Sequence, residues 1–323
     1  MSNLLSAENL DSRLLFAIPK KGRLYEKCLE LLSGADIQFK RAHRLDVALV
    51  QNHNMALVFL PAADIPRFVG EGNVDLGITG QDMVQEAGLS SLISEELQLG
   101  FGKCSLQVQI PDPDSPYAKA DCPRTVDDLV GKKVATSFDT LAGKYFAQID
   151  AKVTEQRRKE GKLKEGESLK TEIEYVGGSV EAACALGLAD GIVDLVESGE
   201  TMRACGLTAI ETLLTSQAVL IRPTTPHPRS DTSLISLITA RLRGVIAAKR
   251  YVLCNYNIRK TALSEALVIT PGRRAATVSP LEDPEWNAVS SMVLKAEVAN
   301  IMDRLEAVGA SDILIIGIDN CRV

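Results

Sequence analysis

The chain has 323 residues, of which 46% are hydrophobic and 24% are charged, and this length predicts two or three domains. The ordinary composition excludes a largely disordered chain and a fibrous repeat. With 36 Lys and Arg against 42 Asp and Glu the net charge is −6, so no nucleic-acid partner is expected, although a local basic pocket for phosphates is compatible with it.

The sequence predicts no membrane partner and a cytoplasmic location. No segment approaches the roughly 20 consecutive apolar residues that span a bilayer, and the first 13 residues lack the basic and apolar regions of a secretory signal. The seven cysteines are scattered without a Cys-x-x-Cys pair, which is typical of a reducing compartment. The three histidines are also dispersed, so a histidine-rich metal site is not expected.

The first hundred residues alternate short apolar runs with segments of helical spacing. We expect strands at 14–18, 55–60 and 74–78, and helices at 24–32, shortly after 61–66, and up to residue 87. Apolar runs of this kind are typical of strands buried on both faces. Their alternation with helices predicts a parallel α/β sheet.

A second α/β unit is expected after residue 103. It comprises a connecting or edge strand at 104–110, strands at 133–136, 173–176 and 191–196, and helices at 125–130, 141–149 and 180–186. Residues 151–170 contain seven Lys or Arg and four Glu. This segment is interpreted as a solvated helix or a surface insertion, with a polyanion contact as the alternative.

The proline-rich segment 223–231 predicts a linker, because its prolines cannot continue a helix or a central strand. A helix at 234–249 is expected after it. Strands at 251–255, 276–279, 288–294 and 313–318 and helices at 262–267 and 297–308 then follow in the order βαββαβ. That order predicts a separate ferredoxin-like domain.

The most informative segment is an apolar strand that leads into Ser-Gly-Glu-Thr at 198–201. Gly199 allows a tight turn, while the two hydroxyls and successive backbone N–H groups suit a terminal phosphate. Asp194 and Glu197 are placed to accept ribose hydroxyls or to bind Mg²⁺. A plain strand-turn-helix is the alternative interpretation.

Polar and glycine-rich loops follow other predicted strands, where open α/β sheets bind their ligands. They are Lys20-Lys21-Gly22-Arg23, Asp64, the Gly77-to-Gly80 turn with Thr79, and Gly177-Gly178-Ser179 followed by Glu181 in a first helical turn. Together these loops predict a cleft for a large phosphorylated ligand, although the Lys-Lys-Gly-Arg segment alone also fits an exposed basic turn. The Gly-Gly-Ser sequence favours an anion site at a helix N-terminus.

Several common catalytic motifs are absent from the sequence. It contains no Walker loop, no Gly-x-Gly-x-x-Gly after a strand and no Gly-x-Ser-x-Gly elbow. Cys205 could be interpreted as a nucleophile, but an ordinary thiol is the simpler interpretation.

Four segments resemble one enzyme family. LLFAIPKKGRL, VFLPAADIPRFVGEGNVDLGITG, YVGGSVEAA and GIVDLVESGETMRACGL, in this order, closely resemble ATP phosphoribosyltransferases, the first enzymes of histidine biosynthesis. The resemblance extends through the C-terminal domain and therefore implies the long form of the family. The amino-acid sequence of the N-terminal segment is similar to that of fungal members of the family.

The resemblance implies a two-lobed core of type II periplasmic-binding-protein topology and a C-terminal ferredoxin-like regulatory domain. Residues 1–102 with 209–224 would form the first lobe, 103–208 the second, and 225–323 the histidine-binding domain. It further implies a Mg²⁺-dependent transfer that joins N1 of ATP to C1 of 5-phosphoribosyl-1-pyrophosphate (PRPP), with release of pyrophosphate. Histidine would act as feedback inhibitor, and the chain would form a dimer that associates into a hexamer.

The matching positions also imply roles for individual residues. The catalytic set is Lys20, Arg23, Glu181 and Asp194, and the PRPP set is Asp194, Glu197, Ser198, Gly199, Glu200 and Thr201. The ATP set is Lys20, Gly22, Arg23, Asp64, Gly77 and Thr79, the histidine set is Asn257, Arg273, Thr277, Met292 and Asp312, and the metal ligands are Glu181 and Asp194. The family often has Asp at the position of Asn257.

Two other functions remain open at this point. An effector-sensing protein of the same two-lobed topology would bind a ligand without catalysis. A purely regulatory amino-acid-binding protein would explain only residues 225–323.

Overall fold

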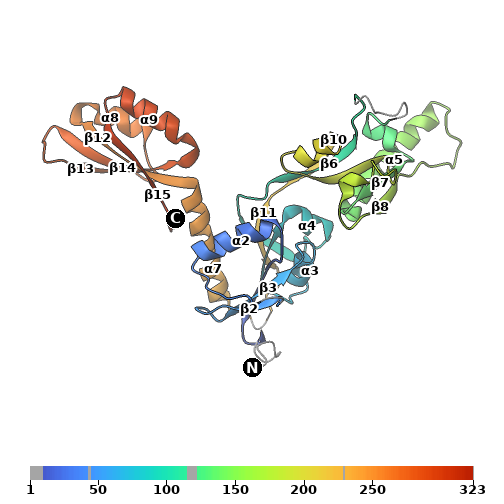
Figure 1. The fold of residues 1–323 in the computed structure, drawn as a ribbon, viewed down its shortest axis with the longest axis horizontal. Coiled ribbons are helices and arrows are strands. Elements are labelled where there is room, and N and C mark those ends of the chain that lie inside the picture. The colour runs from blue at the N-terminus through green and yellow to red at the C-terminus, as the bar shows by residue number, and fades with distance from the viewer. Residues whose placement is uncertain (1–9, 43–44, 115–121, 228–229, 323) are drawn as a thin grey trace. The chain divides into compact units, whose positions relative to one another are not determined.

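The computed structural model describes residues 10–42, 45–114, 122–227 and 230–322 (Figure 1). It divides into two compact units, which are described separately. The first comprises Met1–Lys27, Arg41–Leu49 and Met55–Ser230, and the second comprises Cys28–Lys40, Val50–Asn54 and Asp231–Val323. Residues 1–9, on which the expected absence of a secretory signal depends, and His43 lie outside the described residues.

The first unit contains a six-stranded sheet in the order β2-β3-β1-β4-β11-β5. Its strands are β1 (Leu14–Pro19), β2 (Val47–Leu49), β3 (Met55–Leu60), β4 (Leu76–Gly80), β5 (Ile93–Gln98) and β11 (Ala218–Pro223). β3, β1 and β4 are parallel, whereas β11 runs antiparallel to both β4 and β5. The helices α2 (Arg23–Gly34), α3 (Ile65–Gly70) and α4 (Gln81–Glu86) follow β1, β3 and β4 along the chain.

The same unit contains a five-stranded sheet in the order β10-β6-β9-β7-β8. Its strands are β6 (Cys104–Pro111), β7 (Lys133–Thr136), β8 (Glu172–Tyr175), β9 (Gly191–Val196) and β10 (Leu207–Ser216). As in the first sheet, three neighbouring strands, β8, β7 and β9, are parallel. The next strand across the sheet, β6, runs antiparallel to β9, and β10 at the edge runs antiparallel to β6. The helical elements are η1 (Val126–Leu129), α5 (Asp139–Lys159), η2 (Val180–Ala182) and α6 (Glu200–Ala204).

The two sheets therefore share one strand order, and each receives one antiparallel strand from the chain segments that cross between them. This is the expected type II periplasmic-binding-protein topology. In the first sheet, Ala17, Val219 and Ile221 pack against Ile65 and Val69 of α3. In the second, strand residues such as Val108 and Val193 pack against Phe146 of α5. Burial on both faces explains why these strands have continuous apolar runs.

Several expected elements differ in detail. β6 lies between β10 and β9 rather than at an edge, and the segment 209–224 is divided between β10 of the second sheet and β11 of the first. The helix expected at 180–186 is only the short 3₁₀ turn η2, because Ser179 is left-handed (φ 53°) and Leu186 is 73% exposed. The predicted helix is therefore wrong, although Val180 and Ala183 of this segment are buried.

The charged segment 151–170 is partly the end of α5. This helix continues to Lys159, and three basic residues lie in its last turn, where they stabilise the helix dipole. Most of the side chains from 155 to 168 are exposed. The solvated-helix interpretation is therefore confirmed for 155–159, whereas Val153 and Thr154 are buried.

In the second unit, α7 (Thr232–Arg250) begins after the proline-rich segment, of which residues 228 and 229 lie outside the described part. The Asp231 carboxylate caps it by accepting from the N–H groups of Ser233 and Leu234 at 3.0 and 3.1 Å. Gly34 packs so closely on α7 that a Cβ would lie 2.9 Å from the side chain of Val245.

The rest of this unit is the expected ferredoxin-like domain. It consists of β12 (Tyr251–Arg259), η3 (Lys260–Ala262), α8 (Leu263–Ile269), β13 (Thr277–Pro280), β14 (Trp286–Leu294), η4 (Lys295–Glu297), α9 (Val298–Ala307) and β15 (Ser311–Gly317). The sheet order β13-β14-β12-β15 is that of a βαββαβ unit. Tyr256, Val289 and Leu305 are in its core.

Among the described residues, no helix is both long enough and apolar enough to cross a membrane.

Candidate functional site

The loop 197–201 connects β9 to the short helix α6. Gly199 has a φ of 74°, and a Cβ at this position would lie 2.7 Å from Nη1 of Arg203. Nη2 of Arg203 donates a hydrogen bond to the carbonyl of Ser198 at 3.1 Å. The turn therefore requires glycine for its backbone conformation, whereas the guanidinium stands at the end of a flexible side chain that can shift away from a Cβ. Arg203 is a cation beside the loop that the sequence-based site assignment missed.

This loop lines a cavity of about 270 Å³, which brings together many of the predicted residues. Its lining residues are Arg23, Gln109, Glu181, Asp194, Leu195, Val196, Glu197, Ser198, Gly199, Glu200, Thr201 and Met202. The whole predicted PRPP set and three of the four predicted catalytic residues are among them. Gln109 was missed. A glutamine within a largely apolar interior strand is a sequence signal that could have identified it, and the structure leaves this residue only 2% exposed.

Arg23 reaches this cavity from the start of α2 and pairs with Glu197. Its Nη1 lies 2.7 Å from Oε2 of Glu197, and the two side chains are 81% and 51% exposed. An ion pair this exposed contributes at most about 1 kcal/mol to stability. The guanidinium is therefore weakly held and available to an anionic ligand.

Lys20 and Gly22 belong to the same loop as Arg23, and Gly22 has a φ of 84°. The guanidinium of Arg41 lies 3.9 Å from the ring centroid of Phe59 and donates to the carbonyl of Lys20. This hydrogen bond is long, at 3.5 Å, and it connects Arg41 to the backbone of the loop. The Lys20 side chain is partly exposed.

Asp194 is the carboxylate with the clearest electrostatic perturbation in the cavity. Burial and, to a smaller extent, the nearby charge of Glu181 raise its pKa to about 6, against the lowering effect of the hydrogen bond from the Leu195 N–H at 2.8 Å. A partly buried carboxylate beside a second carboxylate forms a site that a cation would stabilise.

These two carboxylates fit the expected magnesium. Mg²⁺ is usually held by one or two carboxylates together with waters and substrate phosphates. Within the described ranges, no group of three or more His, Cys, Asp or Glu is arranged to hold a metal by itself. Glu181 and Asp194 can therefore be ligands only in combination with waters or a bound phosphate.

Three residues predicted to contact ATP lie elsewhere. Thr79 is fully buried, and its hydroxyl donates to the carbonyl of Ala62 at 2.8 Å. A Cβ at Gly77 would lie 2.7 Å from the side chain of Ile65, so this glycine allows α3 to pack on β4. Both residues support the turn before α3, whereas Asp64 is exposed at the N-cap position of that helix and makes no side-chain capping bond to the described residues.

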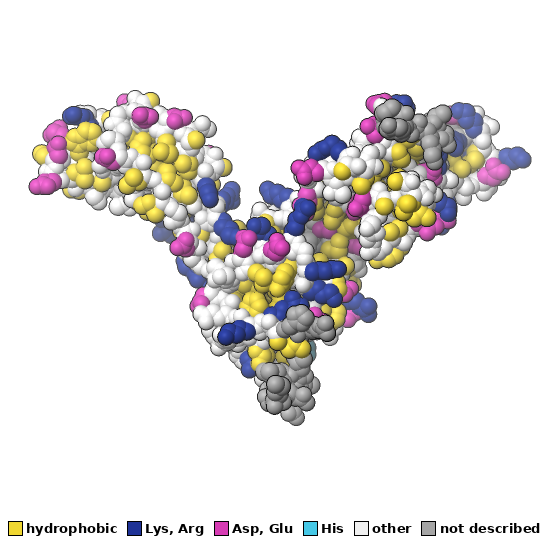
Figure 2. Space-filling model, viewed as in Figure 1, with side chains coloured by type: hydrophobic (Ala, Val, Ile, Leu, Met, Phe, Trp, Pro, Cys, Tyr) yellow, Lys and Arg dark blue, Asp and Glu magenta, His cyan; other side chains and the backbone are white. Residues whose placement is uncertain are grey.

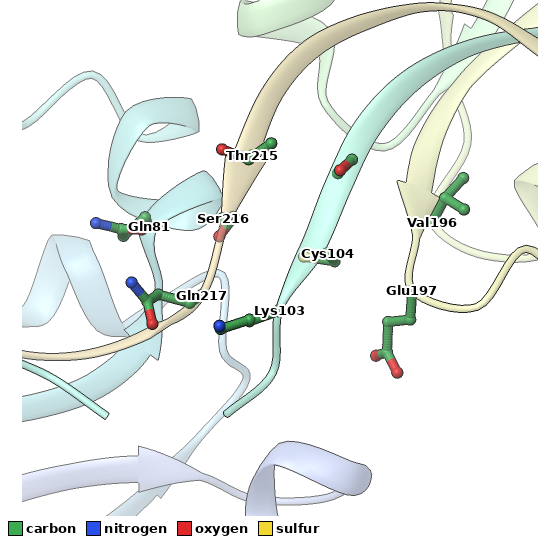
Figure 3. Close-up of a pocket in the computed structure, with 9 residues that line it drawn as sticks. Gln81, Lys103, Cys104, Val196, Glu197, Thr215, Ser216 and Gln217 are labelled. Carbon is green, nitrogen blue, oxygen red and sulfur yellow. The ribbon is translucent and has the colours of Figure 1, made fainter. Parts of the chain in front are cut away.

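A second cavity of about 390 Å³ lies beside the ends of β6 and β10 (Figure 3). It shares Val196 and Glu197 with the first, and its other lining residues are Gln81, Lys103, Cys104, Ser105, Thr215, Ser216 and Gln217. Figure 3 shows the amine of Lys103 extending toward the amide of Gln217. These residues were missed because they come from three separate chain segments without a shared motif.

Cys205 is exposed at the C-terminal end of α6 and lines neither cavity. Its backbone N–H bonds to the carbonyl of Thr201 at 3.0 Å and closes the short helix. This placement favours the ordinary-thiol interpretation.

The predicted histidine-binding residues lie in the C-terminal domain. The register pairs Thr277 with Ser290, Met292 with Leu253, and Asn257 with Ala288, so all three predicted side chains lie on the sheet face opposite the helices. The Asn257 amide donates to Oδ2 of Asp312 at 2.9 Å. Asp312 therefore provides a carboxylate beside Asn257, the position at which the family that the sequence resembles often has Asp.

Arg273 is also placed near this sheet, with its guanidinium 5.8 Å from the ring centroid of Tyr251. Asn255, which sequence reasoning missed, pairs with Ser290 on the same face, and its side-chain oxygen is buried without a hydrogen-bond partner among the described residues. Figure 2 shows apolar side chains at the surface of this domain. Leu314 and Ile316 of β15 are 58% and 45% exposed.

The comparisons with known proteins agree with this architecture. Residues 61–244 match the family model described as ATP phosphoribosyltransferase, and residues 248–320 match that of the HisG C-terminal domain. Curated proteins named ATP phosphoribosyltransferase are 55% identical in Yarrowia lipolytica, 53% in Candida albicans and 50% in Saccharomyces cerevisiae. Each alignment covers 98% of this chain and 98% of the relative.

Among solved structures, the ATP phosphoribosyl transferase (HisG:HisZ) complex from Thermotoga maritima is similar in fold, with a TM-score of 0.53 and 21% sequence identity. The match covers 71% of this chain and 98% of that one.

Proposed function

Because this chain belongs to the ATP phosphoribosyltransferase family, an enzyme family of histidine biosynthesis, we propose that it joins N1 of ATP to C1 of PRPP and releases pyrophosphate. In this step the C1–O bond to pyrophosphate breaks as the N1–C1 bond forms. The observation that carries the proposal is the convergence of the loop 197–201, Asp194 and Arg23 on one cavity.

The loop 197–201 binds the 5-phosphate of PRPP in this proposal. Two hydroxyls, those of Ser198 and Thr201, and the exposed backbone of the turn supply hydrogen-bond donors, and Arg203 adds a nearby positive charge. Backbone N–H groups in such a turn form a concavity that favours anions.

Arg23 and Lys20 stabilise the charge that develops on the departing pyrophosphate. Donors aimed at developing charge are usually the largest single contribution to catalysis. Without substrate, Arg23 is paired with Glu197, so a bound pyrophosphate group would exchange one anionic partner of this arginine for another. Adenine N1 is neutral, so the remaining requirement is correct placement against C1.

Asp194 and Glu181 orient the ribose hydroxyls and hold the metal. When bound, Mg²⁺ would neutralise charge on the pyrophosphate. Because the pKa of Asp194 is raised to about 6, its carboxyl group is only about half ionised near pH 6 and becomes mostly ionised at higher pH. Lys103 with the amides of Gln81 and Gln217 lines the adjoining cavity and is proposed to face the nucleotide.

The direct test is a coupled assay of pyrophosphate release. We expect release only when ATP, PRPP and Mg²⁺ are all present, with N1-(5-phosphoribosyl)-ATP identified by mass spectrometry. Binding of both ATP and PRPP without any pyrophosphate release would contradict the proposal and favour an effector-sensing function.

Arg23→Ala is expected to lower kcat/KM by about 10- to 100-fold, because a hydrogen bond to a charged group is worth about 1.5–3 kcal/mol. The melting temperature should change little, since the Arg23–Glu197 pair is exposed. Steady-state kinetics and thermal melting test this expectation.

Arg67→Ala is a matched control, because Arg67 forms a similarly exposed pair with Glu71 at 2.8 Å on α3. It should retain wild-type kinetics. Equal kinetic losses in the two variants, or normal kinetics in Arg23→Ala, would remove Arg23 from the site.

We also propose that histidine inhibits the enzyme through the C-terminal domain, and that the chain forms a dimer that associates into a hexamer. A ligand that resembles neither substrate acts through a second site by a coupling free energy. The open sheet face offers the hydroxyl of Thr277, the thioether of Met292 and the Asn257–Asp312 pair.

Thr277→Ala in the full-length protein is therefore expected to keep near-normal activity. The histidine concentration for half-inhibition should rise about tenfold or more, because the variant loses one hydrogen bond to a charged ligand. Inhibition curves measure this shift, and sedimentation shows whether the variant keeps the wild-type assembly. Unchanged inhibition that is competitive with PRPP would place histidine in the active cleft instead.

A further inference from the structure

The short helix α4 contacts the cores of both sheets of the first unit. Val84 packs in the cluster that covers the first sheet, together with Ile65 and Val219. Met83, the preceding residue, packs instead against the cluster of the second sheet that contains Phe138 and Phe146. Adjacent residues of one helix therefore contribute to two separate cores. We call α4 the bridging helix.

Polar contacts connect the bridging helix to the second sheet at its beginning. Asp82 is only 4% exposed, its N–H donates to Oγ of Ser216 at 3.0 Å, and that hydroxyl donates back to its carboxylate. Ser216 is the last residue of β10, and Figure 3 shows it beside the start of the bridging helix at Gln81.

The far end of the bridging helix caps another helix. The two carboxylate oxygens of Glu86 accept hydrogen bonds from the N–H groups of Thr140 and Leu141 in the first turn of α5, at 2.8 and 3.0 Å. The first four N–H groups of any helix lack partners within that helix. A carboxylate at this end also interacts favourably with the helix dipole.

In the part of the chain that the structure describes, α5 has no side-chain cap of its own. Its N-cap residue is Phe138, which is 2% exposed, belongs to the core of the second sheet and cannot accept a hydrogen bond through its side chain. Packing therefore decides the residue at this position, and the bond acceptors must come from another element. Glu86 supplies them from 54 residues earlier in the chain.

Hydrogen bonds in turn connect the start of α5 to β9, the strand that carries Asp194. The Phe138 N–H donates to Oγ1 of Thr136 at 2.9 Å, and that hydroxyl donates to the carbonyl of Val193 at 2.7 Å. Val193 immediately precedes Asp194 on β9, and β9 leads into the loop 197–201. A continuous set of contacts thus connects Glu86 to the proposed PRPP-binding residues.

From these contacts we propose that Glu86 is a positioning residue for the phosphoribosyl transfer. By capping α5, Glu86 keeps Asp194 and the loop 197–201 in position relative to the site residues that follow strands of the first sheet, such as Arg23 after β1. This inference rests on the proposed function, because PRPP would be held jointly by the loop 197–201 and Asp194, which follow or belong to β9, and by Lys20 and Arg23, which follow β1. Misplacement by about 1 Å can cost about 100-fold in rate when alignment dominates catalysis.

The test compares Glu86→Ala with Glu86→Gln, and uses Gln85→Ala as the matched control. Gln85 is the neighbouring exposed residue on the bridging helix and lines neither cavity. Glu86→Ala is expected to lower kcat about tenfold or more, with KM values for ATP and PRPP within about threefold of wild type, because the residues that contact each substrate remain. Glu86→Gln should recover part of the loss because its amide oxygen still accepts a hydrogen bond.

Hydrogen exchange supplies a measurement that does not depend on activity. In Glu86→Ala, amides of the peptides 139–146 and 190–201 should both exchange faster than in wild type, while Gln85→Ala should match wild type in both. Faster exchange at 139–146 alone, with normal kcat, would reduce Glu86 to a helix cap and overturn the proposal. If the wild type released no pyrophosphate, the proposed function would fail, and the 190–201 exchange would still decide whether Glu86 controls the loop.

Discussion

Gly199→Val is expected to lower kcat/KM for PRPP by at least about 100-fold. A β-branched residue at a φ of 74° is strained by roughly 1–2 kcal/mol, and its Cβ would lie 2.7 Å from the Arg203 guanidinium. The turn must then open or Arg203 must move, and either change removes phosphate donors worth about 1.5–3 kcal/mol each. Steady-state kinetics with varied PRPP measure the effect.

Gly131→Val provides the matched control. Gly131 also has a positive φ, 82°, but a Cβ there would meet no described atom within 4 Å. Both variants should lose a few degrees of melting temperature from the same backbone strain, and only Gly199→Val should lose PRPP turnover. Similar kinetics in the two variants would show that the loop 197–201 does not bind the 5-phosphate.

Asp194→Asn is expected to abolish most activity and yet to stabilise the protein. The activity loss should be about 100-fold or more, since it removes a charge that the reaction uses at the ribose or the metal. The gain in stability follows from burial, which raises the pKa of Asp194 from 3.8 to about 6. The amide keeps an oxygen that can accept the bond from the Leu195 N–H without carrying a charge.

The sign of the pH dependence follows from that pKa. Below pH 3.8 the carboxyl group is largely protonated in both the folded and the unfolded state, so it does not change the free energy of unfolding. Between pH 3.8 and 6 the unfolded chain ionises first, so the wild type loses stability as pH rises, up to about 1–3 kcal/mol at pH 7 after allowance for partial exposure. The difference in free energy of unfolding between the Asp194→Asn variant and the wild type should therefore grow between about pH 3.8 and about pH 6 and then level off at higher pH.

Denaturant unfolding in EDTA, without substrates, measures this difference. Asp190→Asn is the control, because Asp190 is exposed at the other end of β9 and accepts a bond from the Lys133 N–H that an amide can also accept. It should change neither stability nor activity. A destabilised or fully active Asp194→Asn protein would contradict the proposed role.

Much of the fold could be predicted from local sequence. The strands at 14–18, 55–60 and 191–196 are confirmed because burial on both faces requires continuous apolar runs. The βαββαβ order is confirmed because each of its elements has its own periodicity and its own turn signals. The cleft loops could be identified because a turn with a positive φ, as at Gly199, selects glycine locally.

Elsewhere in the chain a distant contact determines what a local pattern becomes. Gly77 and Thr79 have the composition of a ligand loop, but Gly77 accommodates Ile65 and Thr79 bonds to Ala62. The sequence pattern at 180–186 has helical spacing, but Leu186 stays largely exposed among the described residues, and only a 3₁₀ turn forms. Val180 and Ala183 of this segment are nevertheless buried, so periodicity marks a face that can be buried and does not by itself extend the turn into a helix.

By itself, then, the sequence determined the family, the βα order of each part and the loop that carries the proposed PRPP site, because local periodicity and short motifs encode them. The tertiary structure alone decided which strands pair across the chain, such as β6 between β9 and β10, and which side chains meet from distant segments. The Arg23–Glu197 pair and the capping of α5 by Glu86 belong to this second class. Each joins residues 54 or more positions apart, and their meeting depends on the packing of whole sheets and helices, which no local pattern records.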